Sequence, residues 1–339
     1  MSDKPKRNII FTFDYELFLG KQSGSVYRCA IEPTQKILNI FYELGMSSAI
    51  FFVDTLWLIR LKKVASESSI ARKDYEMVVQ QLQQISRLGH YVFPHLHPHW
   101  ADAIYSKGTN QWQLINYSRY RVHSLDKSER EQCFGDSVAM LKEILGDEYK
   151  PLAYRAGGWS IQPFEDFEPL FQKYNVKYDF SVLPGTKRIS IGQHYDFSDI
   201  KITRPYTFST DVTVPGKGNY TEFPISMVKV SSYTSLINRA YLKYLQLNGS
   251  RSHGDGQGIV VERTENSADN GSEMVSVELL NDVKLPLYLR YLKKNEYMQF
   301  ISHPKMLTQH NIDTFSSFVK RARRSYKVNT DFMKLQPEN

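Results

Sequence analysis

Short apolar runs alternate along the chain with stretches in which apolar residues recur at helical spacing. Strand–helix alternation of this kind implies a parallel sheet, and a chain of 339 residues suits one barrel better than two small domains. We therefore predict an α/β protein, a distorted TIM-like (β/α)7 barrel that forms a single catalytic domain over residues 1–330. The expected strands are 8–14, 48–53, 91–94, 152–155, 177–182, 222–226 and 297–302.

One region departs from this alternation. Residues 247–271 are rich in Gly, Ser, Asn and Asp, so we expect a long polar excursion at the surface. The glycines in this region follow no clear strand and match no nucleotide-binding motif, which argues against a phosphate loop.

Composition indicates a globular protein, because 41% of the residues are hydrophobic and 13% are aromatic. The chain has no apolar run of about 18 residues, so no transmembrane segment is predicted. The basic N-terminus leads into a strand rather than a cleavage site, which predicts no signal peptide. Two cysteines fit a reducing compartment. We therefore expect a cytoplasmic protein.

The net charge of +7 is compatible with acidic partners, including an anionic membrane surface or a phosphate-bearing precursor. The basic residues are scattered except in the run 320–324. That run has no interleaved aromatic residues of the kind that stack bases, so we interpret it as a solvated helix face. No nucleic-acid partner is expected, whereas peripheral membrane contact is compatible with the charge.

Polar residues that could catalyse a reaction or bind a metal lie where the expected strands end. Asp14 and Glu16 close the first strand, Arg155 closes the fourth and His303 closes the last. The carboxyl ends of parallel barrel strands share one face, and barrel enzymes carry out their chemistry there. This distribution predicts an enzyme without any reference to a family.

Three of the nine histidines fall within five residues, at positions 95, 97 and 99. Neutral imidazoles offer nitrogen lone pairs that suit zinc, so His95, His97 and His99 are candidate metal ligands. Alternation along a strand would place all three on one side. The alternative interpretation is a surface loop that is rich in histidine.

Two carboxylates at the end of the first strand allow a division of labour. Period two places Asp14 and Glu16 on the same side, where one can bind a metal while the other acts as a base. Arg155 beside a buried carboxylate would hold that group ionised and oriented. The alternatives are a helix cap or salt bridge for the carboxylates, an ordinary ion pair for Arg155 and a structural role for His303.

Five segments resemble, in order, the polysaccharide deacetylase family, which is carbohydrate esterase family 4. The resemblance spans residues 8–306. It implies a distorted barrel of about seven strands, a divalent metal that is usually zinc, and hydrolysis of acetyl groups from N-acetylated sugars. The segments are Thr12-Phe13-Asp14, Ile50-Phe51-Phe52-Val53, the histidine cluster, Arg155-Ala156-Gly157-Gly158-Trp159 and Ile301-Ser302-His303-Pro304.

The resemblance also implies roles for individual residues. Asp14 corresponds to the general base, and Arg155 to the residue that orients it. His95 and His99 correspond to the metal-binding histidines. His303 corresponds to the general acid.

Aromatic residues beside these motifs are candidates for substrate contact. The resemblance suggests Trp159 as an aromatic wall against a sugar ring, and Tyr154 and Trp100 are further candidates.

Two departures from the family pattern leave the identity of the metal ligands undecided. Most members have two adjacent aspartates, of which the second binds metal, but here Tyr15 follows the first and the next carboxylate is Glu16. Leu96 replaces the usual Ser or Thr. A subgroup shares this His-Leu-His-Pro pattern, and there His97 rather than His99 is a candidate for the second ligand.

The sequence therefore predicts a metal-dependent, zinc-type hydrolase that removes acetyl groups from an N-acetylated carbohydrate or polysaccharide precursor. Two alternatives stay open. One is a different amide hydrolase on the same scaffold, opening a cyclic ureide or imide with or without a metal. The other is a carbohydrate-binding protein with a degenerate site.

Overall fold

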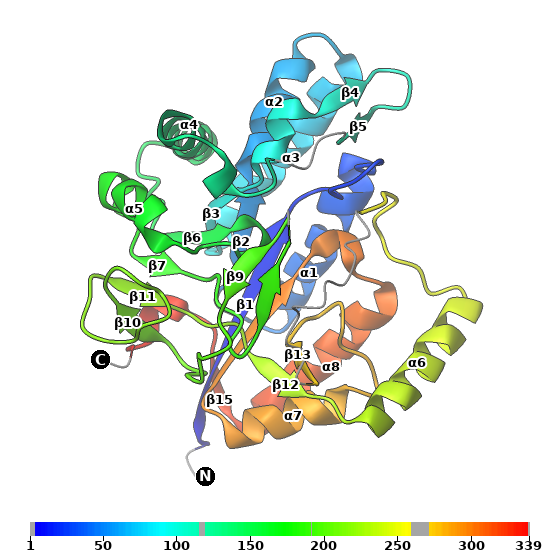
Figure 1. Ribbon diagram of the computed structural model, residues 1–339. Coiled ribbons are helices and arrows are strands. Elements are labelled where there is room, and N and C mark those ends of the chain that lie inside the picture. The colour runs from blue at the N-terminus through cyan, green and yellow to red at the C-terminus, as the bar shows by residue number, and fades with distance from the viewer. Residues whose placement is uncertain (1–3, 115–118, 191, 259–270, 338–339) are drawn as a thin grey trace.

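The computed structural model describes residues 4–114, 119–190, 192–258 and 271–337 and shows a curled sheet with helices on its outside (Figure 1). The strand order of the main sheet is β10-β11-β7-β6-β3-β2-β1-β14, with β15 beside β1, and every pair is parallel except β10 with β11. The strands are β1 (Lys6–Tyr15), β2 (Ile50–Asp54), β3 (Tyr91–Leu96), β6 (Ala153–Ala156), β7 (Tyr178–Asp179), β10 (Tyr206–Phe208), β11 (Tyr220–Glu222), β14 (Tyr297–Ser302) and β15 (Lys327–Asn329).

The predicted α/β alternation is confirmed. The sheet is a curled half-barrel, and the full (β/α)7 barrel of the prediction is not confirmed. The chain after β11 crosses from one edge of the sheet to the other. Ile225 donates a backbone hydrogen bond to Val182 at 2.9 Å, and Ser226 donates one to Gln299 of β14 at 3.4 Å. Pro224 has no N–H to extend a ladder at this point, which explains why no regular strand closes the ring.

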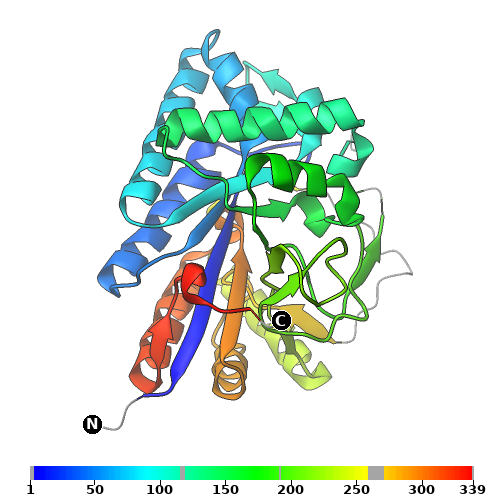
Figure 2. The ribbon, with the colours of Figure 1, turned by 90° about the vertical axis from the view of Figure 1, so that its left-hand side faces the viewer.

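Eight helices in the described ranges pack around the sheet (Figure 2). Asp126 and Glu129 form a complete capping box at the start of α4, and Gly146 caps the end of this helix. None of the described helices is long and apolar enough to cross a membrane. The helices are α1 (Glu32–Glu43), α2 (Thr55–Ala65), α3 (Ser69–Arg87), α4 (Lys127–Leu145), α5 (Glu168–Tyr174), α6 (Ser232–Leu247), α7 (Leu285–Lys294) and α8 (Gln309–Ser325).

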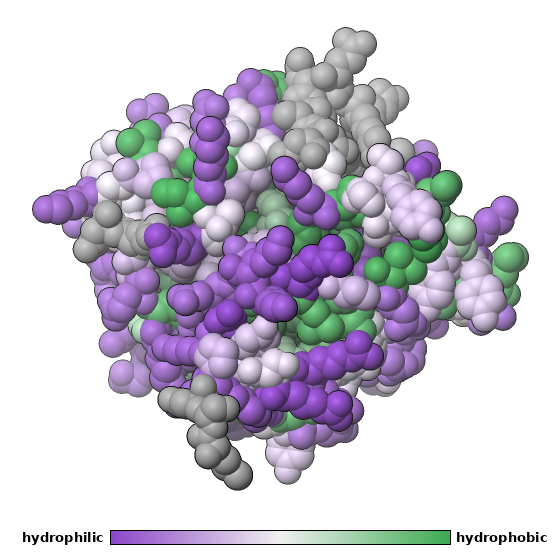
Figure 3. Space-filling view, turned by 90° about the horizontal axis from the view of Figure 1, so that it is seen from below, coloured by the Kyte–Doolittle hydropathy of each residue, from purple (hydrophilic) through white to green (hydrophobic). Residues whose placement is uncertain are grey.

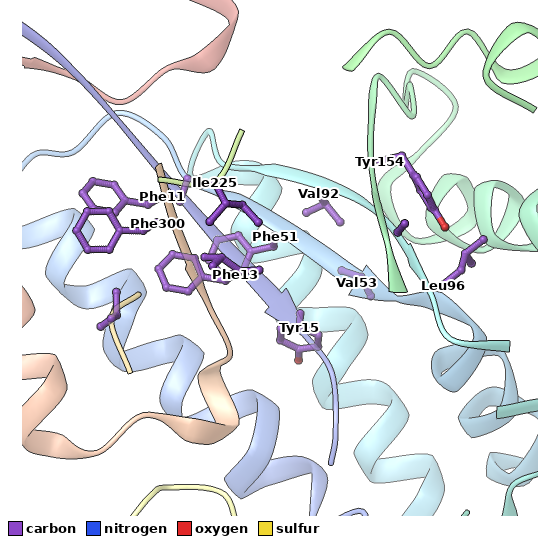
Figure 4. Close-up of a cluster of buried hydrophobic side chains, with 14 of the residues drawn as sticks. Phe11, Phe13, Tyr15, Phe51, Val53, Val92, Leu96, Tyr154, Ile225 and Phe300 are labelled. Atoms are coloured by element: carbon purple, nitrogen blue, oxygen red, sulfur yellow. The ribbon is translucent and has the colours of Figure 1, made fainter. Parts of the chain in front are cut away.

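The two faces of the sheet bury different sets of side chains. Phe11 and Phe13 of β1 point outward with Phe51 and Phe300, into the core between sheet and helices (Figure 4). The alternate residue Ile10 points inward, into a second apolar cluster. The alternation predicted for the first strand is therefore confirmed.

The inner cluster fills the lower half of the curled sheet. It consists mainly of aromatic rings, and Phe332 from the C-terminal segment packs edge-on against five of them: Tyr91, Phe93, Tyr178, Phe180 and Phe223. Further along each strand the inward positions become polar. The apolar layer therefore lies beneath the polar side chains at the carboxyl ends of the strands.

The predicted excursion at 247–271 is only partly described, because residues 259–270 lie outside the described ranges. Its described part packs against the body of the protein. Gln257 bridges to Gln22, and the Gly254 N–H donates to the carbonyl of Lys305 at 3.0 Å. A side chain at Gly256 would meet the Phe18 ring at 2.5 Å, so glycine permits this close approach.

Candidate metal and catalytic site

Three side chains meet at the carboxyl ends of the strands, one from the residue just after β1, one from the end of β3 and one from the residue just after β3. The Glu16 Oε2 atom lies 3.0 Å from His97 Nε2 and 3.5 Å from His95 Nε2, and the two Nε2 atoms are 3.0 Å apart. All three side chains are buried. Among the described residues, these three side chains form a cluster that could hold a metal ion.

The spacing of these atoms fits a tetrahedral metal. Zinc bonds of about 2.0–2.1 Å at tetrahedral angles separate neighbouring ligand atoms by about 3.3–3.4 Å. The three separations of 3.0–3.5 Å bracket that value. Two imidazoles and one carboxylate are also a donor set that zinc accepts, with further positions left for water or substrate.

Both histidines direct Nε2 toward Glu16. His95 Nδ1 lies 2.8 Å from the carbonyl oxygen of Arg155, its neighbour in the β3–β6 register. A carbonyl oxygen only accepts, so Nδ1 carries a proton and Nε2 is the ring atom that faces Glu16. Burial lowers the pKa of His97, which favours its neutral, ligating form.

Gly157 permits the close packing behind His97. A Cβ atom there would lie 2.3 Å from the Leu96 carbonyl oxygen and 2.9 Å from His97 Nδ1. The glycine pair that follows Arg155 therefore lets the end of β6 approach the histidine segment.

Lys305 balances the buried charge of Glu16. Its Nζ atom lies 2.8 Å from Glu16 Oε1 and 2.6 Å from the Leu17 carbonyl oxygen. Burial alone would raise the pKa of the Glu16 carboxyl, but Lys305 and then the two histidines outweigh burial and hold this pKa well below its usual range. Glu16 is therefore an anion with one oxygen on Lys305 and the other toward the histidines.

Asp14 and Arg155 form a buried ion pair beside this group. Arg155 Nη1 donates to Asp14 Oδ1 at 2.5 Å, and Arg155 Nη2 donates to Thr12 Oγ1 at 2.7 Å. Its Nε–H donates to the Phe180 carbonyl at 3.0 Å, so three bonds hold the guanidinium in place. This leaves Asp14 Oδ2 to face the rest of the site.

His303 approaches the carboxylates from the end of β14. Its Nε2 lies 3.6 Å from Asp14 Oδ2 and 3.8 Å from Glu16 Oε1. On its other side, Nδ1 lies 2.9 Å from Glu278 Oε1, and its backbone N–H donates to Glu278 Oε2 at 2.6 Å. Burial alone would lower the pKa of His303, but Glu278 and then Asp14 and Glu16 raise this pKa to about 9. The imidazole is therefore protonated at neutral pH.

The structure thus brings together six of the residues expected to act in the site and separates others. His99 lies in the short 3-10 helix Pro98–Asp102, where its ring stacks on Tyr120 at 5.1 Å, outside the Glu16 group. The strand ends at Leu96, so the period-two alternation that would align three histidines does not reach His99. The structure therefore places His99 apart from the group formed by Glu16, His95 and His97.

Two of the three aromatic residues predicted to contact substrate are buried away from the opening. Tyr154 is buried in the outer core against Phe134 and Phe167, because it alternates with the inward Arg155. Trp100 is also fully buried. Neither position supports direct substrate contact, whereas the half-buried Trp159 remains a candidate.

Asp54, Glu278 and Lys305 are site residues that the sequence reasoning missed. Asp54 closes β2 as Asp14 closes β1, so the same strand-end pattern could have found it. It accepts a hydrogen bond from the Trp100 Nε1–H, and burial followed by repulsion from Glu16 raises its pKa to about 8. Glu278 lies outside strands and helices, and no sequence pattern marked it or Lys305.

Comparison with solved structures identifies the class of fold. The fold of a protein named as a polysaccharide deacetylase from Mycobacterium smegmatis is similar, with a TM-score of 0.50 and 14% identity over 100% of this chain and 95% of that one. The mixed α/β architecture with its curled sheet is therefore similar to the fold of that protein.

The same architecture also occurs in larger enzymes that act on glucans. A 4-alpha-glucanotransferase from Thermococcus litoralis matches with a TM-score of 0.51 and 11% identity, over 98% of this chain and 41% of its own. A branching enzyme from Pyrococcus horikoshii matches with a TM-score of 0.50 and 11% identity, over 99% and 72%. No family model and no curated protein sequence matches the chain. At these identities the comparisons establish the fold, and function depends on the site itself.

Proposed function

We propose that the protein is a metal-dependent hydrolase that removes acetyl groups from an N-acetylated carbohydrate. The observation that carries this proposal is the convergence of Glu16, His95 and His97 beside Asp14 and His303. A metal-ligand group, a base and an acid then share one face of the sheet. The deacetylase-like fold is consistent with this activity.

His95, His97 and Glu16 are the residues that would hold the metal. When bound, a divalent metal supplies a Lewis acid for the acetyl carbonyl and makes water a nucleophile at neutral pH. Lys305 keeps Glu16 ionised and holds one of its oxygens, so that the other stays directed toward the histidines.

The proton transfers are assigned to Asp14 and His303. Asp14 accepts a proton from the attacking water, because the ion pair with Arg155 holds its carboxylate in place. His303, protonated and fixed by Glu278, delivers a proton to the amide nitrogen as the C–N bond breaks. The products are acetate and the free amine, with protons and electrons balanced.

A sugar-containing precursor is the substrate class that we favour. Trp159 lies two residues after Gly157, which packs beside His97, and is half-buried, so it can present an aromatic face to a sugar ring. A net charge of +7 favours a phosphate-bearing, lipid-linked or nucleotide-linked sugar in the cytoplasm.

One observation favours a second candidate, a metal-free amide hydrolase acting on a cyclic ureide or imide. Lys305 already places a positive charge 2.8 Å from Glu16, so part of the charge that a metal would neutralise is balanced within the chain. In that case Lys305 and the histidines would stabilise the developing negative charge on the carbonyl oxygen.

Metal analysis combined with an acetate-release assay tests the proposal. Protein purified without added zinc is expected to contain about one divalent metal per chain. It should release acetate from N-acetylated oligosaccharides, lose activity on chelation and regain it with zinc. Hydrolysis of a cyclic imide by metal-free protein would support the second candidate. Sugar binding without any acetate release would indicate a degenerate site and contradict both.

Replacing Glu278 by glutamine is expected to shift the alkaline limb of the pH–activity profile. A general acid works only while protonated, so activity should fall as the pH rises through the His303 pKa of about 9. Glu278 is the main group that raises this pKa, so Glu278→Gln should move the limb toward the ordinary value near 6.5. The measurement is kcat/KM against pH.

Glu43→Gln, at an exposed position on α1, is the matched control and should leave the limb in place. If Glu278→Gln lowers the rate but leaves the alkaline limb at its original pH, Glu278 has only a structural role.

A further inference from the structure

Helix α6 exposes an unusual amount of apolar surface. Figure 1 places this helix at the lower right of the molecule, where it projects from the body. Leu247 is 78% exposed and Leu236 is 61% exposed. The fifteen large hydrophobic residues that are exposed in the described ranges include six from α6 alone: Tyr233, Leu236, Ile237, Leu242, Tyr244 and Leu247.

Most of these side chains form one stripe. Tyr233, Leu236, Ala240, Tyr244 and Leu247 follow one another at intervals of three or four residues, so they share one side of the helix. Figure 3 shows hydrophobic residues at the right-hand edge of the molecule, the side on which α6 lies. We call these five residues the α6 stripe.

The opposite side of α6 faces the protein and is held by polar contacts. Asn238 accepts a hydrogen bond from Asn281 at 2.8 Å, and the Tyr241 hydroxyl donates to Asp282 at 2.6 Å. The α6 stripe is therefore directed away from the body by contacts that fix the rotation of the helix.

A hollow of about 430 Å³ lies between α6 and α8. It is lined by Leu242 and Leu245 from the helix and by Glu278, which holds His303. Helix α6 therefore lies close to the candidate catalytic site, with the hollow on the side of the helix away from the α6 stripe.

The charges on α6 determine what can cover the stripe. The helix carries Arg239 and Lys243 and has no acidic residue. Helical geometry places both cations along one edge of the stripe. A second copy packed stripe to stripe would bring four like charges together without compensation from the helix. An anionic surface would pair with these charges while burying the apolar side chains.

We propose that the α6 stripe docks on an anionic lipid bilayer. Leucines enter the boundary of the acyl chains, tyrosines lie at the headgroup level, and Arg239 and Lys243 contact lipid phosphates. Docking by α6 sets the candidate site next to the membrane surface, where a lipid-linked substrate would be presented. The docking itself is independent of the proposed hydrolase activity.

Vesicle sedimentation of the full chain, without substrate, tests this proposal. The protein should pellet with vesicles of phosphatidylcholine and phosphatidylglycerol, more weakly as salt is added, and stay in the supernatant with phosphatidylcholine alone. The double variant Leu236→Ser with Leu247→Ser should stay in the supernatant. Arg239→Gln with Lys243→Gln should bind about thirty-fold more weakly, since each basic residue near an anionic surface contributes roughly a factor of five.

Matched controls use exposed residues elsewhere. Tyr42→Ser on α1 removes an exposed apolar side chain, and Lys63→Gln on α2 removes an exposed charge, so both should bind as the unaltered protein does. Circular dichroism checks that each variant is folded. Equal binding to phosphatidylcholine alone, no binding to anionic vesicles, or full binding by the leucine double variant would overturn the proposal. A dimer that the leucine double variant converts to a monomer would instead assign the stripe to a second copy, which also overturns it.

Discussion

Asp14→Asn is expected to lower acetate release by about 10²–10⁴-fold, the usual contribution of a general base. The amide would keep the shape of the side chain but could not accept the proton of the attacking water. Arg155 would still donate to the amide oxygen, so the orientation of the side chain should survive. The measurement is kcat/KM for acetate release by protein whose metal content equals that of the unaltered chain.

Folding must be measured with this variant, because it leaves the Arg155 charge buried without its partner. Breaking a buried ion pair in this way costs about 3–5 kcal/mol, so the thermal midpoint should fall and the assay must run well below it. Asp147→Asn is the matched control, since its side chain is almost fully exposed. Full activity in folded Asp14→Asn would refute the assignment of Asp14 as the base.

His97→Ala is expected to abolish stable metal binding. His97 contributes one of three converging ligand atoms, 3.0 Å from both Glu16 Oε2 and His95 Nε2. Loss of a group that merely supports a ligand lowers metal affinity about 10–100-fold, so loss of a ligand should cost more than about 100-fold. Zinc affinity by competition with a chromophoric chelator, together with metal content after dialysis, measures this effect without any activity assay.

His99→Phe is the matched control, and it also decides which histidine is the second ligand. Burial holds the pKa of His99 well below its usual range, and its ring stacks on Tyr120, so phenylalanine should preserve the packing. This variant should retain zinc. If His99→Phe loses zinc while His97→Ala keeps it, the ligand set that we propose is wrong.

The predicted elements and the observed ones agree best where side-chain period and burial point the same way. The run 8–14 lies between β2 and β14 in the sheet and is buried on both faces. The runs 177–182 and 222–226 reduce to the short strands β7 and β11. There the backbone bonds cross to loops and to β14, and local pattern carries no information about such distant partners.

The site residues also divide into those that local pattern predicts and those that depend on the tertiary structure. Asp14, Arg155 and His303 stand at strand ends, so their approach follows from the parallel arrangement of β1, β6 and β14. The histidines at 95, 97 and 99 are chemically equivalent in the sequence. The end of β3 at Leu96 separates them, because His97 still follows the strand direction while His99 belongs to the next turn.

By itself the sequence determined the alternation of strands and helices, the inward face of the central strands and the strand ends at which polar chemistry gathers. These properties are local, since period and residue type specify them within a few positions. Only the tertiary structure decided that the sheet stays an open half-barrel, that Glu16 joins His95 and His97, and that Lys305 and Glu278 fix the charges around them. These contacts join residues up to 289 positions apart, and their formation depends on how the strands pair and curl.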